Sequence, residues 1–318
     1  MAMQATLTTT IPAPGFLFDV AFSPDGRWLA LATAGKRVPV VEVATGRERL
    51  AVRHGSWRGR GALGVAFSPD GRWLATCGRW DRAARIWDAN TGKQLHKIPH
   101  KFVDNPGAGY PKVQAVAFSP DNRLLATGSA DCTARIFEVA TGQELLRVTN
   151  APGVNDVAFS PDGRWLATSG KTTRIWDATS GEELVGVSHD WCGRVAFSPD
   201  GRLLATTGED KTARVWDTAS GQEVAAFRHD TRTWDVAFGP DGRWLVVGGG
   251  DTARVWDAHR SEELLVVRHE VPASMPDAPM SVAFSPDGRV LVTSGHSGRR
   301  LLDHVVRVWQ LREASTAG

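Results

Sequence analysis

Seven near-identical copies of one short segment predict an all-β chain folded as a seven-bladed β-propeller. The segment is Val-Ala-Phe-Ser-Pro-Asp-Gly-Arg followed by an apolar Leu-Ala-Thr run, and its copies start at Val20, Val65, Val116, Val157, Val195, Val236 and Val282. A second phrase, Arg-Ile/Val-Trp-Asp or a variant of it, follows each copy downstream. A repeat of roughly 40–45 residues with such a Trp near its end is typical of one four-stranded propeller blade.

The repeat over residues 195–221 illustrates how each expected blade is built. Its first strand alternates apolar and small side chains, and the Ser-Pro-Asp-Gly-Arg that follows predicts a tight turn in which Gly201 accepts a positive φ. Trp216 gives the third strand a large area to bury. The four expected strands are residues 195–198, 203–207, 214–217 and 223–227. Such a sheet cannot bury its faces alone, so it needs neighbouring blades.

Closure of the ring is predicted from the two ends of the chain. After Trp309 only residues 310–318 remain, too few for a turn and a full fourth strand, whereas residues 4–11 are β-prone but have no strand ahead of them. We therefore expect residues 4–11 to complete the last blade, so that residues 1–318 form one propeller domain. The alternative is a frayed N-terminal tail.

These phrases closely resemble the WD-repeat β-propellers over essentially the whole chain. In five blades the third strand carries that family's Trp followed by Asp or Gln. The resemblance implies a buried hydrogen-bond network in each blade, made of a His before the first strand, a Ser or Thr in the second, an Asp in the next turn, and the Trp. Blades two, five and seven match in full, with His54, Thr76, Asp81 and Trp87; His189, Thr206, Asp210 and Trp216; and His269, Thr293, Asp303 and Trp309.

The other blades depart from this pattern. Blade three has Phe137 for the Trp, blade six has Val247 for the Thr, blade four lacks the His and the Asp, and blade one lacks nearly all of the set. We expect blades one and four to be the least rigid. Because recurrence in register indicates a structural role, we assign these residues to no catalytic or metal site. The cluster of His296, Asp303 and His304 matches no standard zinc spacing, and we expect neither metal nor cofactor.

Composition narrows the partners and the compartment. The net charge of +2 does not favour nucleic acid, and we expect neither a membrane segment nor a secretion signal. Three cysteines without a C-x-x-C spacing fit a reducing cytoplasm. Arg outnumbers Lys, which with abundant Ala and Gly suggests a GC-rich, bacterial genome, although a consensus design would look similar. We expect a monomer.

Function is expected where the repeats differ, since insertions in repeat proteins map to loops on one face. The Ser-Pro-Asp-Gly turns and the Ala-Thr-Gly-like turns are uniform, so their face should be plain. The long connections are residues 54–64, 100–115, 269–281 and 294–304. They belong to blades seven, two and three, which the closed ring brings together with blade one. We therefore expect one elaborated sector on the opposite, variable face.

Aromatic residues outside the repeat point to the same variable face. Trp and Arg are common anchors of protein interfaces, although each Trp could instead pack its own loop. The predicted partner-binding residues are Trp57, Arg58, Arg79, Trp80, Phe102, Tyr110, Trp191, Arg232, Trp234, Arg299 and Arg300.

The leading functional hypothesis is a non-enzymatic scaffold or docking module that binds a protein or peptide, as WD-repeat proteins typically do. One alternative is a sensor of a small molecule or nucleic acid on the Arg/Trp loops. A second is an enzyme at the channel mouth, for which the non-repeated Asp19, Asp156, Asp235 and Arg194 are the candidates. These four residues include no nucleophile–base pair at a recognisable spacing.

Overall fold

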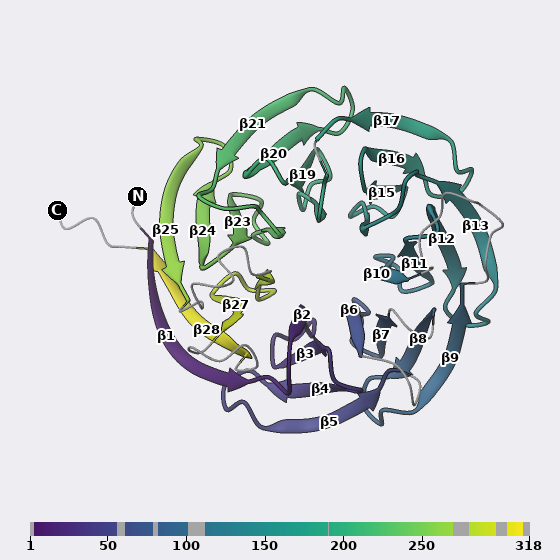
Figure 1. Cartoon of the computed structure of the whole chain (residues 1–318), viewed down its shortest axis with the longest axis horizontal. Coiled ribbons are helices and arrows are strands. Elements are labelled where there is room, and N and C mark those ends of the chain that lie inside the picture. Colours follow the sequence, from purple (N-terminus) through teal and green to yellow (C-terminus); the bar gives the residue numbers. More distant parts are fainter. Residues whose placement is uncertain are drawn as a thin grey trace.

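The protein is a ring of seven four-stranded antiparallel sheets, which confirms the predicted propeller (Figure 1). The computed structural model describes residues 3–55, 61–78, 82–100, 112–189, 191–269, 280–296 and 304–313. Six sheets follow the chain in order, with the first strand of each blade beside the central channel and the fourth at the outer rim. In blade 5 the strands lie within two residues of the predicted ones.

The strands of the first three blades each come from one repeat. Blade 1 consists of β2 (Leu17–Phe22), β3 (Trp28–Thr33), β4 (Arg37–Glu42) and β5 (Glu48–Arg53). Blade 2 consists of β6 (Ala62–Phe67), β7 (Trp73–Gly78), β8 (Ala83–Asp88) and β9 (Gln94–Pro99). Blade 3 consists of β10 (Val113–Phe118), β11 (Leu124–Ser129), β12 (Thr133–Glu138) and β13 (Glu144–Thr149).

The next three blades repeat this order. Blade 4 consists of β14 (Asp156–Phe159), β15 (Trp165–Ser169), β16 (Thr173–Asp177) and β17 (Glu183–Val187). Blade 5 consists of β18 (Val195–Phe197), β19 (Leu203–Thr207), β20 (Thr212–Asp217) and β21 (Glu223–Arg228). Blade 6 consists of β22 (Asp235–Phe238), β23 (Trp244–Gly249), β24 (Thr252–Asp257) and β25 (Glu262–Arg268).

Blade 7 joins the two ends of the chain and confirms the predicted closure. Its strands are β26 (Val282–Phe284), β27 (Val290–His296), β28 (His304–Glu313) and, outermost, β1 (Met3–Pro12). β1 runs antiparallel to β28, with Met3 opposite Glu313 and Pro12 opposite Val305. Ile11 is almost fully buried, at 1% exposure, so β1 contributes to the core as well as to the sheet.

The repeated turn between the first and second strands owes its shape to side chain–backbone bonds. In blade 5, Ser198 Oγ donates to Asp200 Oδ1 at 2.6 Å and accepts the Leu203 N–H at 2.9 Å. Gly201 has a φ of +73°, a conformation that a residue without a Cβ adopts at no steric cost. Asn122 takes the same position in blade 3 with a φ of +65°, which Asn tolerates better than other side chains.

The core lies between the blades rather than within them. One buried cluster combines Val40 and Val52 of blade 1 with Val65, Leu74 and Trp87 of blade 2. Equivalent clusters join other neighbouring blades around the ring. Because each sheet buries its apolar side chains against the next one, a single blade has no core of its own.

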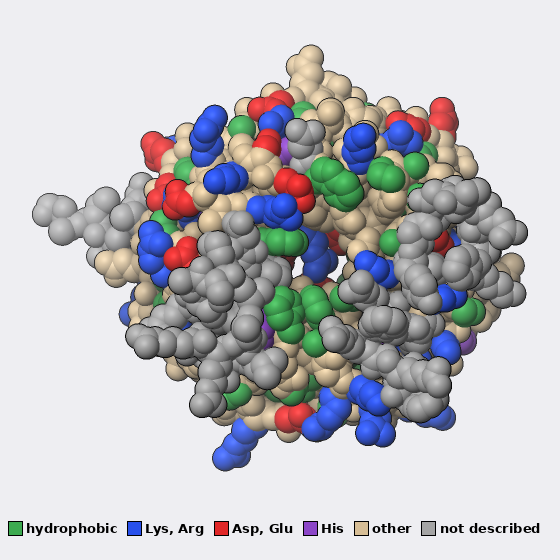
Figure 2. Space-filling model, viewed as in Figure 1, with side chains coloured by type: hydrophobic (Ala, Val, Ile, Leu, Met, Phe, Trp, Pro, Cys, Tyr) green, Lys and Arg blue, Asp and Glu red, His purple; other side chains and the backbone are tan. Residues whose placement is uncertain are grey.

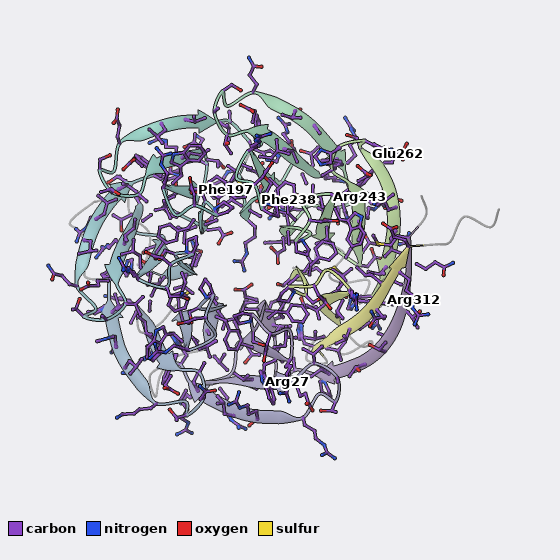
Figure 3. All side chains as sticks on the ribbon, turned by 180° about the vertical axis from the view of Figure 1, so that it is seen from behind. Arg27, Phe197, Phe238, Arg243, Glu262 and Arg312 are labelled. Atoms are coloured by element: carbon purple, nitrogen blue, oxygen red, sulfur yellow. The ribbon has the colours of Figure 1, made fainter. Side chains whose placement is uncertain are left out.

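The two faces of the ring differ. Viewed as in Figure 1, hydrophobic side chains surround the central opening and basic ones lie within it (Figure 2). From behind, Phe197 and Phe238 of the first strands lie towards the channel, and Glu262 and Arg312 lie at the outer edge (Figure 3). The repeated Ser-Pro-Asp-Gly turns belong to this second face, the plain face of the sequence analysis.

Removal of residues 1–11 tests the closure of the ring. It leaves β28 without its outer partner and takes away buried Ile11. Several kcal/mol of pairing and burial are lost, and in a chain of this size each kcal/mol moves the Tm by about 2 °C. We expect the Tm in a thermal unfolding scan to fall by about 10 °C or more.

Two point variants of β1 serve as matched controls. Ile11→Ala should cost about 2–5 kcal/mol because it leaves a cavity in the core. Leu7→Ala, at a site that is 45% exposed, should cost far less. A truncated protein that melts at the wild-type temperature would contradict the closure.

Candidate functional site

Three of the predicted partner-binding residues, Trp191, Arg232 and Trp234, lie in the described part of the chain. The other predicted partner-binding residues fall outside it, namely Trp57, Arg58, Arg79, Trp80, Phe102, Tyr110, Arg299 and Arg300. Most of the long connections also lie outside the described residues, so the elaborated sector stays a prediction. Trp191 and Trp234 belong to blades 5 and 6, which are not among the blades of that sector, although blade 6 adjoins blade 7.

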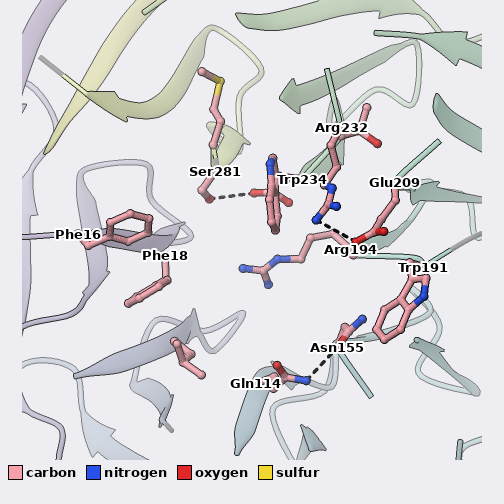
Figure 4. Close-up of a pocket in the computed structure, with 15 residues that line it drawn as sticks. Phe16, Phe18, Gln114, Asn155, Trp191, Arg194, Glu209, Arg232, Trp234 and Ser281 are labelled. Atoms are coloured by element: carbon pink, nitrogen blue, oxygen red, sulfur yellow. Dashed lines mark hydrogen bonds and ion pairs between the residues drawn. The ribbon is translucent and has the colours of Figure 1, made fainter. Parts of the chain in front are cut away.

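The three described residues meet at the mouth of the central channel, where all seven blades line an open cavity of about 460 Å³ (Figure 4). Seven lining residues share one repeat position, two residues before the repeated Val, and no two are of the same type. They are Phe18, Leu63, Gln114, Asn155, Gly193, Trp234 and Met280. Sequence reasoning missed most of them, although variation just ahead of a near-constant motif was a visible signal.

Trp191 is the most unusual residue of the mouth. Its side chain is 53% exposed and its φ is +45°, a conformation that side chains with a Cβ rarely adopt. The adjoining backbone is held in place because Asn155 donates to the Cys192 carbonyl at 3.0 Å and the Cys192 N–H donates to Gly170 O at 2.9 Å. A large apolar side chain held exposed on strained backbone is a feature of binding sites.

Aromatic and charged side chains complete the rim. The guanidinium of Arg232 lies 5.3 Å from the ring centre of Trp234 and forms a 2.8 Å ion pair with Glu209. Phe16 and Phe18 of blade 1, whose rings are 4.9 Å apart, line the mouth on the other side of the channel (Figure 4). The rim therefore offers aromatic rings from opposite sides of one opening.

Arg194 reaches from blade 5 across the channel beneath this rim (Figure 4). Its guanidinium forms ion pairs with Asp19 of blade 1 at 3.0 Å and with Asp156 of blade 4 at 3.3 Å. The four residues proposed as enzymatic candidates, Asp235 included, are thus brought to one place. Two of the three carboxylates are used to hold the guanidinium.

The three aspartates also connect neighbouring blades. Each precedes the repeated Val of its own blade, and each accepts the backbone N–H of the repeated Val of the following blade. The pairs are Asp19 with Val65 at 3.0 Å, Asp156 with Val195 at 3.0 Å, and Asp235 with Val282 at 2.9 Å. These hydrogen bonds give each aspartate a structural role, which accounts for its place in the ring without a catalytic function.

Burial around the channel raises the pKa of all three carboxyls above the usual value for Asp. The pKa of Asp19 reaches about 7, because removal from water and the neighbouring Asp235 and Asp156 outweigh the attraction of Arg194. The pKa values of Asp156 and Asp235 are raised for the same principal reason, with Arg194 opposing the shift. The Arg194 guanidinium pairs with two of these carboxyls and attracts Asp235 from beyond ion-pair distance, so the three carboxyls of this cluster face one guanidinium.

Comparison with known proteins agrees with this architecture. The family described as "WD domain, G-beta repeat" matches residues 52–88, 101–138, 143–177, 182–217, 221–257 and 271–310, well over half of the chain. The chain belongs to the WD-repeat family. The six matched segments cover the repeats from blade 2 onward, and blade 1, which departs furthest from the pattern, is the one without a match of its own.

Among characterised proteins, the chain is similar to guanine nucleotide-binding protein subunit beta from Zea mays, from Oryza sativa and from Solanum tuberosum. Each is 26% identical over 141 residues, which is 43% of this chain but only 35% of the relative's length. These are plant proteins, so they lend no support to the bacterial source expected from the composition.

The hydrogen bonds implied by the WD-repeat resemblance are present in blade 5. His189 Nδ1 lies 2.7 Å from Thr206 Oγ1, Trp216 Nε1 donates to the same oxygen at 2.8 Å, and Asp210 lies 3.2 Å from His189 Nε2. Burial lowers the pKa of His189, which is therefore neutral near pH 7. This histidine is engaged inside the wall of the ring and is not directed at the channel mouth.

Blades 2 and 7 contain the same three-residue core of the network. His54 and Trp87 both bond Thr76, at 2.7 and 2.8 Å. His269 and Trp309 both bond Thr293, at 2.6 and 2.9 Å. The remaining members of these two sets, Asp81 and Asp303, lie outside the described residues.

Blades 4 and 6 replace missing members with neighbours that the sequence analysis did not consider. In blade 4, Asn150 Nδ2 donates to Thr168 Oγ1 at 3.0 Å, in the place of the His, and Trp176 donates to the same oxygen at 2.9 Å. In blade 6, His229 Nε2 lies 3.1 Å from Thr252 Oγ1, since Val247 offers no hydroxyl.

The described residues contain neither a metal-ligand cluster nor a membrane-spanning helix. There, no group of three or more His, Cys, Asp or Glu side chains is arranged to hold a metal ion. The same part of the chain contains no helix of the length and apolarity needed to cross a bilayer.

Thr206→Val tests the repeat network, because it keeps the shape of the side chain but removes the hydroxyl that joins His189 to Trp216. Two buried polar groups lose their shared partner, and we expect the free energy of unfolding in urea to fall by about 2–3 kcal/mol. The control Thr179→Val, on an exposed turn, should change it by less than about 0.5 kcal/mol. Equal effects of the two variants would contradict the network.

The variant Asp19→Asn tests the raised pKa of Asp19 through the pH dependence of the free energy of unfolding. The folded protein holds a proton on Asp19 up to about pH 7, whereas the unfolded chain loses it near pH 4. The contribution of Asp19 to the free energy of unfolding therefore falls as the pH rises between about 4.5 and 7.5. Buried His100, His189 and His229 have lowered pKa values, so their contribution to the free energy of unfolding rises with pH. They are present in both proteins, and the comparison of the two therefore cancels their effect.

We therefore expect wild type to lose up to about 3 kcal/mol relative to Asp19→Asn across that range, with no further change above pH 8. Urea unfolding at a series of pH values measures the difference. Asp200→Asn, at a turn where the Ser198 hydrogen bond lowers the pKa, should run parallel to wild type between pH 5 and 7.5. A wild-type curve parallel to that of Asp19→Asn would refute the assignment.

Proposed function

We propose that this protein is a non-enzymatic interaction module that binds a protein or peptide at the channel mouth and on the loops around it. The observation that carries the proposal is Trp191, half exposed on strained backbone beside an open cavity. Trp234, Phe16 and Phe18 extend this apolar surface around the opening. Aromatic side chains in such a setting are the usual anchors of protein interfaces.

The family supports a binding role in general terms. WD-repeat propellers typically act as protein-interaction scaffolds, and the plant relatives are named as subunits of a larger protein. Because a fold does not by itself determine a function, the proposed binding role rests on the residues at the mouth of this chain. We infer the kind of partner from the residues of this site and do not transfer it from the relatives.

The two alternatives have less support in the described residues. For an enzyme, Arg194, Asp19 and Asp156 would have to act on a substrate, yet they bind one another and the backbone of neighbouring blades. For a nucleic-acid sensor, the rim would need a basic excess, but Arg232 is paired with Glu209 and the net charge is only +2.

We further propose that the protein works as a monomer in the cytoplasm. The three cysteines Cys77, Cys132 and Cys192 are buried and free, as expected for a reducing compartment. Sedimentation equilibrium at micromolar concentration tests the monomer, and a reporter fusion in the source organism tests the compartment.

The double variant Trp191→Ala, Trp234→Ala tests the proposed binding face. A random-peptide display library is selected on wild type, and the enriched peptides are assayed on both proteins. We expect affinity to fall by about 100-fold or more, since two interface aromatics commonly contribute about 2 kcal/mol or more each. Thermal unfolding should confirm that both proteins are folded.

A second double variant on the outer rim is the control. Leu184 and Val224 are 43% and 57% exposed on the outermost strands of blades 4 and 5. Changing both to Ala removes exposed apolar surface far from the mouth and should leave peptide affinity unchanged. If the peptides bind the rim variant more weakly but bind the mouth variant as tightly as wild type, the binding site is not at the mouth.

A further inference from the structure

We propose that the mouth cavity receives a basic side chain, Arg or Lys, from an extended segment of the protein partner, and that Asp235 is the carboxylate that pairs with it. This inference rests on the proposed function, because it specifies the chemistry of the ligand at the same site.

The charged groups of the mouth are not all paired with one another. Asp235 lines the cavity, as does Arg194, but Arg194 forms its ion pairs with Asp19 and Asp156. Within the described part of the chain, Asp235 has no cation at ion-pair distance. Its carboxylate accepts only neutral donors, from Ser281 Oγ at 2.8 Å and the backbone N–H groups of Val282 and Val236, both at 2.9 Å. One carboxylate at the mouth is therefore held in place without an ion pair of its own, and Arg194 attracts it only from beyond ion-pair distance.

The walls of the cavity are rich in aromatic side chains. Trp234, Trp191, Phe16 and Phe18 present aromatic rings to the cavity, and the faces of such rings attract ammonium and guanidinium groups. The long aliphatic stem of Lys or Arg would pack on these rings while its charged end reaches the carboxylate. Arg232 does not satisfy the site, since it lies against Trp234 but is paired with Glu209.

Other ligand charges fit less well. An anionic side chain would approach three carboxyl groups and a guanidinium that already forms ion pairs with two of them. A neutral apolar side chain could contact the rings but would bury the Asp235 carboxylate still further without supplying a cation, at a cost. A basic side chain both covers the rings and supplies the missing charge.

Proton linkage gives a signature specific to this proposal. A cation placed next to the cluster favours ionised carboxylates, and Asp19 is partly protonated near pH 7. Binding of a basic side chain at pH 7 should therefore release a fraction of a proton. An apolar ligand at the same rim has no reason to do so.

The experiment uses the whole protein and three blocked tripeptides, acetyl-Gly-X-Gly-amide, in which X is Arg, norleucine or Glu. Isothermal titration calorimetry at pH 7, in phosphate and in Tris, gives affinity and proton release together. We expect the Arg peptide to bind at least about 10-fold more tightly than the norleucine peptide and to release protons. We expect the Glu peptide not to bind.

The variant Asp235→Asn should remove this preference, so that the Arg and norleucine peptides bind alike. The matched control Asp241→Asn makes the same change in the same blade, in a turn of the plain face, and should behave as wild type. The comparison of the three peptides on wild type requires no variant, so a poorly folding Asp235→Asn would not prevent the test.

Equal wild-type affinities for Arg and norleucine, a preference for Glu, or no binding of the Arg peptide at 10 mM would each overturn the proposal. Failure of the proposed function is distinguishable from these outcomes. The selected peptides could require Trp191 and Trp234 yet bind Asp235→Asn as tightly as wild type. That result would support the interaction module and refute only the basic ligand.

Discussion

The pairing of β1 with β28 is the contact on which the rest of the structure depends. Each blade covers its apolar faces only with its neighbours, as Val40 and Val52 of blade 1 do with Trp87 of blade 2. An open arc of blades would leave one face of each terminal sheet in water. With β1 in place both ends of the chain share blade 7, and the first strands are held in a ring around one channel.

Closure of the ring also places three carboxyl groups close together at the central channel. It brings Asp19, Asp156 and Asp235 together at the channel, where burial raises their pKa values because it disfavours the ionised carboxylates. Arg194 relieves part of this cost by crossing to Asp19 and Asp156, and backbone N–H groups relieve more. Asp235 makes no ion pair with Arg194, and it is the carboxylate that we propose to pair with a basic ligand.

Repetition separates structural residues from residues available for function. The His189, Thr206 and Trp216 network recurs in other blades, and where a member is missing a neighbour such as Asn150 or Thr252 takes its role. Such replacement shows that the bond, rather than the residue type, is what the fold requires. The position two residues before the repeated Val differs in every blade, and all seven of its residues line the mouth cavity.

The sequence by itself determined the number of blades, the strands of each repeat and the closure by residues 4–11, because these follow from local periodicity and from turns made by neighbouring residues. It also marked Trp191, Arg232 and Trp234 as exceptions to the repeat. Only the tertiary structure placed them with Phe16 and Phe18 around one cavity, and only it joined Arg194 to carboxylates of two other blades. These residues are far apart in the chain, and their distances are set by the radius of the closed ring, a property of all seven blades that no single repeat encodes.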